Sequence, residues 1–458
     1  MDNLLEKALD FKAKGQRNKA IETLELGLLY KPQDVYIKYN LAALQGDLGN
    51  FTVAASLCEE LVKGGFKNYA TWLVLARAYL GKGDLKNAFD TYMNAKLLLP
   101  NSPELHRELS QLLWMMTGSS EDALSEIESA ITEHPDDIAL HLVKIEIMGY
   151  VGLRSTQLKL ARELIFRFPN NVNVKYLYSR VALKSKHFDD AARYASDVYK
   201  LSSNNPDVII HYANCLLACG NEKLGNEIVS NACTLFPNNQ HLKAIQTTLW
   251  RLLGDPRYEY YCNYDKLVIQ GDLYTPKGWN SLENYIADLE AELQEAHKFK
   301  AHPFGQSVRK GSQVAFVNKS DTRAMQSYDE ALIGPVRDYL RKTTDRCKIG
   351  EVNPTLLGAW SVKLFNSGHH KNHVHQNGWL SSVCHLRFPS TDDSFKEGWL
   401  KIGEPGMVTS RKLCAQKYIQ PKKGQVVIFP SYVWHGTVPI NGNDERLSVA
   451  ADINNDKT

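Results

Sequence analysis

The residues best suited to chemistry are histidines gathered in one stretch of the chain. Five of the 14 histidines lie within 17 residues, at His369, His370, His373, His375 and His385. A sixth, His435, follows the apolar segment 424–430. Imidazoles gathered in this way suit iron, copper, nickel or zinc. A loop that carries surface histidines without a metal is the simpler alternative.

Strand geometry predicts which histidines share a site. Side chains at positions i and i+2 point to the same face of a strand, so His373 and His375 would project together from the segment 372–381. His435, at the end of the predicted strand 424–430, would come from the facing sheet. The sequence therefore predicts a metal site formed by His373, His375 and His435, with no catalytic residue beyond these ligands.

A second group, Arg446 and Ser448, predicts an anion site near the metal. Arg446 comes 11 residues after His435, across an Asn441–Gly442 pair that is typical of hairpin turns. We therefore expect its strand to lie beside that of His435. A guanidinium inside a barrel needs an anionic partner, and a carboxylate can take both prongs of its fork. A cosubstrate that needs both a metal and a distal cation is 2-oxoglutarate.

The elements that precede this segment form a repeat array. Glycines stand at 15, 49, 83, 118, 152, 220 and 254, with spacings of 34, 34, 35, 34, 68 and 34 residues. Lys186 occupies the position of the missing glycine. Five residues after most of these marks comes an alanine: Ala20, Ala54, Ala88, Ala123 and Ala191. The glycine would close the first helix of each unit, and the alanine would let the second helix approach its neighbour.

This pattern resembles the tetratricopeptide repeat over residues 1–255, with about seven units. Such arrays stack into an α-solenoid with a concave groove. The resemblance implies a protein or peptide ligand in that groove, with Asn40 and Asn214 on first helices as candidate contacts. Solvated or cap-forming asparagines are the alternative.

After residue 255 the period changes. Residues 256–350 are predicted to form a connector with helices packed on the following domain, one over 281–299 with Ser281 as N-cap and one over 328–342 that contains Pro335. Residues 351–458 are predicted to form a double-stranded β-helix, or jelly roll. Its candidate strands are 356–366, 379–389, 398–403, 411–421, 424–430 and 446–454. The fold class is therefore multidomain α + β.

Composition excludes several classes of protein. Lys plus Arg is 54 and Asp plus Glu is 51, for a net charge of +3. That balance is too even for a protein built around nucleic acid or an acidic membrane surface. The N-terminus has no apolar signal segment, and no stretch reaches the ~18 apolar residues that span a bilayer. We expect a cytoplasmic protein.

Residues 250–453 resemble the Fe(II)/2-oxoglutarate-dependent oxygenases, and more narrowly a bacterial group that joins tetratricopeptide repeats to such a domain. The segments that carry the resemblance are 250–261, 302–313, 358–365, 369–383, 429–439 and 445–453. It implies iron and 2-oxoglutarate as cofactors, with His373 and His435 as ligands and Arg446 and Ser448 as the Arg-x-Ser clamp. The usual pattern has Asp or Glu where this chain has His375.

Three functions are therefore weighed. The first is a dioxygenase that uses 2-oxoglutarate and hydroxylates a protein or peptide. The second is a three-histidine dioxygenase of the cupin type without 2-oxoglutarate, against which Arg446 and Ser448 argue. The third is a non-enzymatic adaptor with a degenerate oxygenase fold. Near the site, Ser307 with its neighbours Gln306 and Arg309 could shape the pocket mouth or form a structural turn. The aromatic residues Trp379, Tyr432 and Trp434 could line the pocket, although packing is their commoner role.

Overall fold

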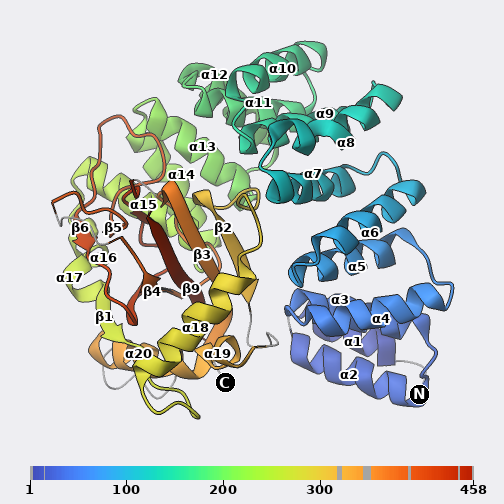
Figure 1. Ribbon diagram of the computed structural model, residues 1–458. Helices are drawn as coiled ribbons and strands as arrows, with labels where there is room; N and C mark the ends of the chain where they lie inside the picture. Colours follow the sequence, from blue (N-terminus) through green and yellow to red (C-terminus); the bar gives the residue numbers. More distant parts are fainter. Residues whose placement is uncertain are drawn as a thin grey trace. The chain divides into compact units, whose positions relative to one another are not determined.

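The computed structural model (Figure 1) describes residues 4–14, 16–316, 322–343, 352–389, 394–441 and 444–455. The chain divides into two compact units, one built on Met1–Ile147 and the other on Met148–Val314 and Thr322–Thr458. The boundary falls within the last turn of one helix, α9 (Ile138–Tyr150). The later repeats therefore belong to the same unit as the sheets.

The first unit consists of helices that pack in consecutive pairs. They are α1 (Leu4–Ala13), α2 (Arg17–Tyr30), α3 (Val35–Asp47), α4 (Phe51–Lys63), α5 (Tyr69–Gly81), α6 (Leu85–Leu98), α7 (Pro103–Thr117), α8 (Ser120–Glu133) and most of α9. In the second unit the pattern continues with α10 (Arg154–Arg167), α11 (Val172–Lys184), α12 (Phe188–Leu201), α13 (Pro206–Ala218), α14 (Glu222–Leu235) and α15 (Gln240–Leu253). The predicted solenoid of helix pairs is confirmed.

The repeat marks have the conformations that their chemistry predicts. The glycines after first helices adopt positive φ: Gly49, Gly83, Gly118, Gly152, Gly220 and Gly254. Lys186 takes the same left-handed conformation, with φ of 64° and no glycine. Each of the five marked alanines has no exposed surface, because the paired helices approach closely there. The first mark, Gly15, lies outside the described residues.

Short elements and helices connect the repeats to the sheets. They are α16 (Arg257–Tyr261), α17 (Tyr264–Leu267), α18 (Leu282–Ala296), α19 (Arg323–Gln326) and α20 (Tyr328–Thr343). The predicted N-cap is present, because the Ser281 side chain accepts from the Asn284 backbone N–H over 3.2 Å. Pro335 lies inside α20 and does not mark its start. Helices α18 and α20 contact strands of the larger sheet.

The strands form two sheets. The larger has the order β1-β7-β4-β9-β3-β2 and the smaller the order β6-β5-β8. Their bounds are β1 (Ile269–Asp272), β2 (Val308–Phe316), β3 (Pro354–His370), β4 (Leu380–Arg387), β5 (Leu400–Ile402), β6 (Lys417–Ile419), β7 (Gln425–Pro430), β8 (His435–Thr437) and β9 (Glu445–Asn455). The pairings β1–β7, β3–β9, β4–β7, β4–β9, β5–β6 and β5–β8 are antiparallel, as expected for a jelly roll.

The hairpin expected around Asn441 is wrong. Strand β8 pairs with β5 in the smaller sheet, whereas β9 lies between β4 and β3 in the larger one. Arg446 is therefore not on a strand adjacent to that of His435. The Asn-Gly pair reports only a local turn preference, and long-range pairing with β3 and β4 decides where β9 lies. Gly442 itself is outside the described residues.

The last repeat shares an apolar core with the sheets. Trp250 of α15, Tyr258 and Tyr264 of the connector and Phe429 and Trp434 of the jelly roll are buried in one cluster. Polar contacts reinforce this core, because Trp434 Nε1 donates to Thr248 Oγ1 over 3.0 Å and Arg251 Nη1 to the Gly403 carbonyl over 2.8 Å. The repeats from α10 to α15 thus form part of the unit that carries the sheets. Across the described parts of the chain, no helix has both the length and the apolar character needed to cross a membrane.

Candidate metal centre

The structure brings His373, His375 and His435 together. The Nε2 atoms of His373 and His375 are 3.3 Å apart. The ring of His435 has its centroid 4.2 Å from that of His373 and 5.0 Å from that of His375. One potential ligand atom from each residue lies within 4.8 Å of the other two. This arrangement can hold a single metal ion.

The backbone that positions these histidines differs from the expected strand. His373 forms an isolated bridge with His435, in which each backbone N–H donates to the other's carbonyl over 2.9 and 3.1 Å. The residues around His375 are irregular, and its N–H donates to the Ser431 carbonyl over 3.1 Å. His435 begins β8 in the smaller sheet rather than ending β7. The prediction that His373 and His375 share one face of a continuous strand is therefore wrong, although the two side chains do lie together.

Each of the three imidazoles has its Nδ1 atom engaged away from the group. Nδ1 of His373 lies 2.8 Å from the Lys371 carbonyl, and Nδ1 of His435 lies 2.9 Å from the Val433 carbonyl. Nδ1 of His375 lies 2.5 Å from Oδ1 of Asp452. Because a carbonyl or carboxylate oxygen accepts, Nδ1 carries the proton in all three rings. Each Nε2 is then a lone-pair donor suited to a metal ion.

Burial keeps the imidazoles of His373 and His435 neutral. It lowers the pKa of His373 to about 3, with a further contribution from the neighbouring His375. It also lowers the pKa of His435 well below the usual range, since a charged ring would be desolvated and would face His373. A neutral imidazole is the form that binds metal, so protons compete weakly for these two ligands at neutral pH.

Asp452 is a component that sequence reasoning missed. Besides its contact with His375, its Oδ1 accepts from Ser381 Oγ over 2.8 Å. Gly378 leaves the space that this carboxylate occupies, since a Cβ there would lie 3.0 Å from Asp452 Cγ. The available signal was parity on β9, because Arg446, Ser448 and Asp452 are separated by even numbers of residues and share one face.

Arg446 lies on that same face as a buried cation. Its side chain has 1% relative exposure, and burial lowers the pKa of its guanidinium to about 10. Nε donates to the Gly398 carbonyl over 3.1 Å and Nη1 to Ser448 Oγ over 2.9 Å. Among the described residues it makes no ion pair. A buried guanidinium without a counter-ion is costly unless an anion binds there.

The register shows how the anion site and the metal ligands are spaced. On β9, Ser448 and Asp452 are four residues apart, which is about 13 Å along a strand. Ala450 lies between them, flanked by Trp360 on β3 and Val383 on β4. Ala450 and Trp360 remain partly exposed. The face therefore carries polar groups at both ends and a partly accessible apolar stretch between them.

His385 belongs to this cluster rather than to the metal group. It lies opposite Ser448 in the β4–β9 pair, and its Nδ1 is 3.2 Å from Nη2 of Arg446. His385 is not part of the metal group, and its place beside the guanidinium was not predicted from the sequence. This position depends on the register of β4 against β9, which pairs His385 with Ser448.

Ser307 contacts the histidines, whereas the flanking aromatic residues mostly pack elsewhere. Ser307 Oγ lies 2.9 Å from Nδ1 of His370 and 3.3 Å from Nε2 of His373. Trp434 donates to α15, and Tyr432 donates to the Tyr261 carbonyl over 2.8 Å. The other residues named from the sequence are Gln306, which is exposed, Arg309, which donates to the carbonyls of Gln306 and Val308, and Trp379, which is half-buried.

These features fit the groups that the sequence implied. Three imidazole nitrogens form a donor set suited to Fe(II). A buried, unpaired guanidinium with a hydroxyl beside it suits a carboxylate. The third ligand position holds His375 where the 2-His-1-carboxylate triad would place a carboxylate, yet Asp452 supplies a carboxylate directly behind it.

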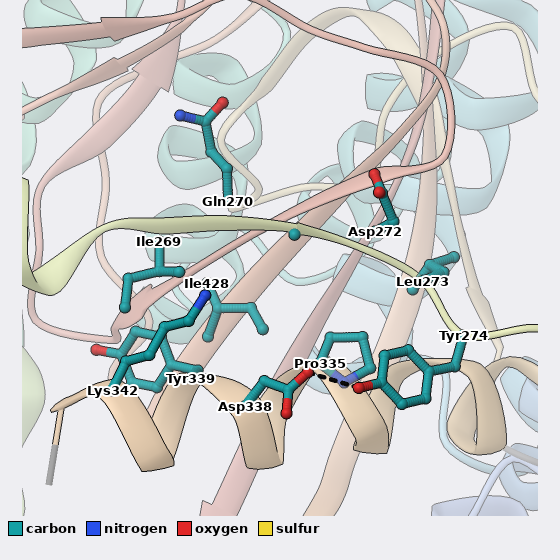
Figure 2. Close-up of a pocket in the computed structure, with 11 residues that line it drawn as sticks. Ile269, Gln270, Asp272, Leu273, Tyr274, Pro335, Asp338, Tyr339, Lys342 and Ile428 are labelled. Atoms are coloured by element: carbon teal, nitrogen blue, oxygen red, sulfur yellow. Dashed lines mark hydrogen bonds between the residues drawn. The ribbon is translucent and has the colours of Figure 1, made fainter.

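A separate cavity of about 300 Å³ lies between β1 and α20 and is shown in Figure 2. Its lining includes Gln270, Asp272, Tyr274, Asp338 and Lys342. Tyr274 donates to Asp338 over 2.5 Å, so these two polar groups satisfy each other. None of the predicted site residues lines this cavity.

Comparison with known proteins gives one family match. Residues 358–452 match the family model described as "Putative 2OG-Fe(II) oxygenase". This range includes the three histidines of the metal group, His385, Arg446, Ser448 and Asp452. No curated protein matches the chain.

Solved structures resemble parts of the chain at low identity. A tetratricopeptide repeat protein from Parabacteroides merdae is 17% identical over 54% of this chain and 98% of its own, with a TM-score of 0.40. A prolyl-4-hydroxylase from Pseudomonas putida is 16% identical over 42% of this chain and 95% of its own, with a TM-score of 0.30.

Proposed function

We propose that the C-terminal domain is an Fe(II)- and 2-oxoglutarate-dependent dioxygenase that hydroxylates a protein or peptide substrate presented by the repeats. The observation that carries this proposal is the pairing of two features within one domain. Three imidazole Nε2 atoms converge with their Nδ1 atoms already engaged, and the buried Arg446 has no carboxylate partner among the described residues. A metal site alone would not require the second feature.

His373, His375 and His435 would hold the iron, and each Nδ1 contact would fix the orientation of its ring. When bound, Fe(II) supplies the redox chemistry that couples oxidative decarboxylation of 2-oxoglutarate to succinate with oxidation of a substrate C–H bond. Asp452 accepts the Nδ1–H of His375 and so makes that imidazole a more basic ligand. This carboxylate also offsets part of the charge of the metal ion, which a neutral histidine does not balance as a carboxylate ligand would.

Arg446 and Ser448 would hold the distal carboxylate of 2-oxoglutarate. The contacts of Arg446 with Gly398 and Ser448 fix the guanidinium before the anion arrives, so little side-chain entropy is lost on binding. Buried apolar side chains surround this region, with Val362, Leu364 and Ile440 in one cluster. They exclude water, which strengthens the contact between the guanidinium and the carboxylate.

A peptide substrate is supported by the surface beside the metal loop. A cavity of about 380 Å³ is lined by Phe236, Pro237, Asn238 and Asn239 from the turn before α15 and by Gln376 and Asn377. Gln376 directly follows His375. Amide side chains both donate and accept hydrogen bonds, as a peptide backbone does. The last repeat and the segment that follows His375 thus contribute to one surface beside a proposed metal ligand.

Metal affinity of matched histidine variants tests the proposal. We expect His373→Ala and His435→Ala to lose Fe(II) binding, measured by chelator competition without oxygen. His385→Ala, in the same segment, should retain it because His385 is not in the metal group. Loss of metal in His385→Ala with retention in His373→Ala would contradict the ligand assignment.

One observation favours a second function. His375 in the third position suits a three-histidine dioxygenase that does not use 2-oxoglutarate. Such an enzyme would bind iron through the same residues, so the metal assay does not separate the two. Binding of 2-oxoglutarate does, because only the first function gives Arg446 an anionic partner.

A further inference from the structure

A buried histidine beside Arg446 has one nitrogen without a partner. The His385 side chain has no exposed surface, and it lies on β4 directly opposite Ser448 on β9. Its Nδ1 is 3.2 Å from Nη2 of Arg446. Its Nε2 is buried and makes no hydrogen bond to any described residue. Buried polar atoms are rarely left in this state.

The neighbour on Nδ1 fixes what the free nitrogen must be. A guanidinium has only donors, so Nη2 of Arg446 donates and Nδ1 of His385 accepts. The neutral ring then carries its proton on Nε2. The unpartnered atom is therefore an N–H donor in a dry site, and the missing component is a hydrogen-bond acceptor.

Two other groups at this place, Ser448 and the guanidinium of Arg446, also have donors without an acceptor among the described residues. Ser448 Oγ accepts from Nη1 of Arg446, which leaves its hydroxyl proton free to donate. The guanidinium has used one N–H of each terminal nitrogen, toward Ser448 and toward His385, and Nε on Gly398. His385 and Ser448 thus flank the two terminal nitrogens of one fork. An acceptor with two oxygens and a negative charge satisfies such a set best.

We propose that His385 is a positioning residue for the cosubstrate and that its Nε2–H donates to the distal carboxylate of 2-oxoglutarate. This inference rests on the proposed function. It adds a consequence for specificity, since Arg446, Ser448 and His385 would all bind the distal carboxylate of the cosubstrate. The site should therefore select a dicarboxylic 2-oxo acid over a monocarboxylic one of similar chain length, and His385 should contribute to that selection.

Calorimetric titration without oxygen tests the proposal on the full chain loaded with Fe(II). The probes are 2-oxoglutarate and 2-oxopentanoate, which has the same carbon chain without the distal carboxylate. We compare wild type with His385→Phe, which keeps a ring but no donor, and with His385→Gln, which keeps an N–H donor. Metal affinity is measured in parallel and should remain unchanged in both variants.

We expect His385→Phe to weaken 2-oxoglutarate binding by roughly 10- to 100-fold, the range for a hydrogen bond to a charged group. His385→Gln should recover part of this loss, and 2-oxopentanoate should bind all three proteins alike. Equal 2-oxoglutarate affinity in wild type and His385→Phe would overturn the role of His385 alone. Equal losses in both variants would also overturn it, because packing rather than the donor would be responsible. Absence of 2-oxoglutarate binding to wild type would overturn the proposed function itself.

A second measurement applies if His385→Phe does not fold. The protein labelled with ¹⁵N-histidine and loaded with Zn(II) should show a shifted His385 Nε2–H resonance when 2-oxoglutarate is added. The resonance is assigned by its absence from the spectrum of His385→Gln. 2-Oxopentanoate should leave it in place. An unchanged resonance at saturating 2-oxoglutarate would overturn the proposal.

Discussion

Replacement of Asp452 by asparagine should weaken metal binding while the fold is preserved. Asp452 is 9% exposed, and its Oδ1 lies 2.5 Å from Nδ1 of His375 and 2.8 Å from Oγ of Ser381. Asparagine has nearly the same shape, and its side-chain oxygen can accept both contacts. The substitution therefore removes mainly the negative charge behind His375.

The size of the effect follows from what that charge does. A carboxylate that accepts the second ring N–H of a ligand histidine raises the basicity of the ligand, and its loss typically costs 10- to 100-fold in metal affinity. Because the oxygen of asparagine still orients the ring, we expect the lower end of this range. That is a loss of about tenfold, or about 1.4 kcal/mol of binding free energy.

Chelator competition with Fe(II) or Zn(II) measures this loss directly. Ser381→Ala is the matched control, because it removes a hydrogen bond from a neutral hydroxyl to the same carboxylate and leaves the charge. It should reduce metal affinity by about threefold or less. Thermal melts of the metal-free proteins check that both variants fold. If Asp452→Asn binds metal as tightly as wild type, or only as weakly as Ser381→Ala does, the charge behind His375 does not tune the site.

Three further predictions concern the anion site, the repeats and the response to pH. Arg446→Ala should keep its metal affinity, but its affinity for 2-oxoglutarate, measured by calorimetry, should fall by roughly 10- to 150-fold. Arg446→Lys should recover only part of this affinity, because lysine lacks the planar fork. If Arg446→Ala binds 2-oxoglutarate as tightly as wild type does, Arg446 does not hold its distal carboxylate. Deletion of residues 1–137, which keeps α9 whole, should leave a folded protein that binds metal and consumes 2-oxoglutarate. This protein should have lost activity on its macromolecular substrate. Full activity on that substrate would mean that the early repeats do not present it. His297, whose pKa burial lowers to about 4, is neutral in the fold while the unfolded chain binds a proton near pH 6.5. As the pH is lowered from about 6.5 to 4, the free energy of unfolding should therefore fall, by at most about 1.4 kcal/mol per pH unit from this residue. His297→Gln should flatten that slope. If the denaturant midpoints of wild type and His297→Gln change with pH along parallel curves, the role given to His297 is wrong.

The repeats were predictable because their signals are local. A left-handed cap after each first helix and an alanine at a close helix contact each depend on a few neighbouring residues. Lys186 shows where the signal ends, since it adopts φ of 64° without the glycine that normally marks it. The strands that form β3, β4, β7 and β9 were also located, since apolar runs between turn residues identify them without their partners.

The arrangement of the strands was not predictable in the same way. The Asn441–Gly442 pair favoured a hairpin, yet β9 lies between β3 and β4 and pairs with both of them. His385 and Asp452 acquired their places from this pairing, which local patterns do not encode. The contact of Trp434 with Thr248 joins residues 186 positions apart. Local sequence patterns therefore did not predict that the last repeats belong to the same unit as the sheets.

Succinate formation is the measurement that tests the central claim most directly. The purified chain, loaded with Fe(II) and given 2-oxoglutarate and oxygen, should release succinate at a slow rate even without its substrate. This release should be absent from His435→Ala, which loses a proposed metal ligand, and from wild type without iron. Succinate formation by wild type that depends on Fe(II) and on His435 is the predicted result. Iron bound at full stoichiometry with no 2-oxoglutarate consumed, with or without candidate peptides, would contradict the account.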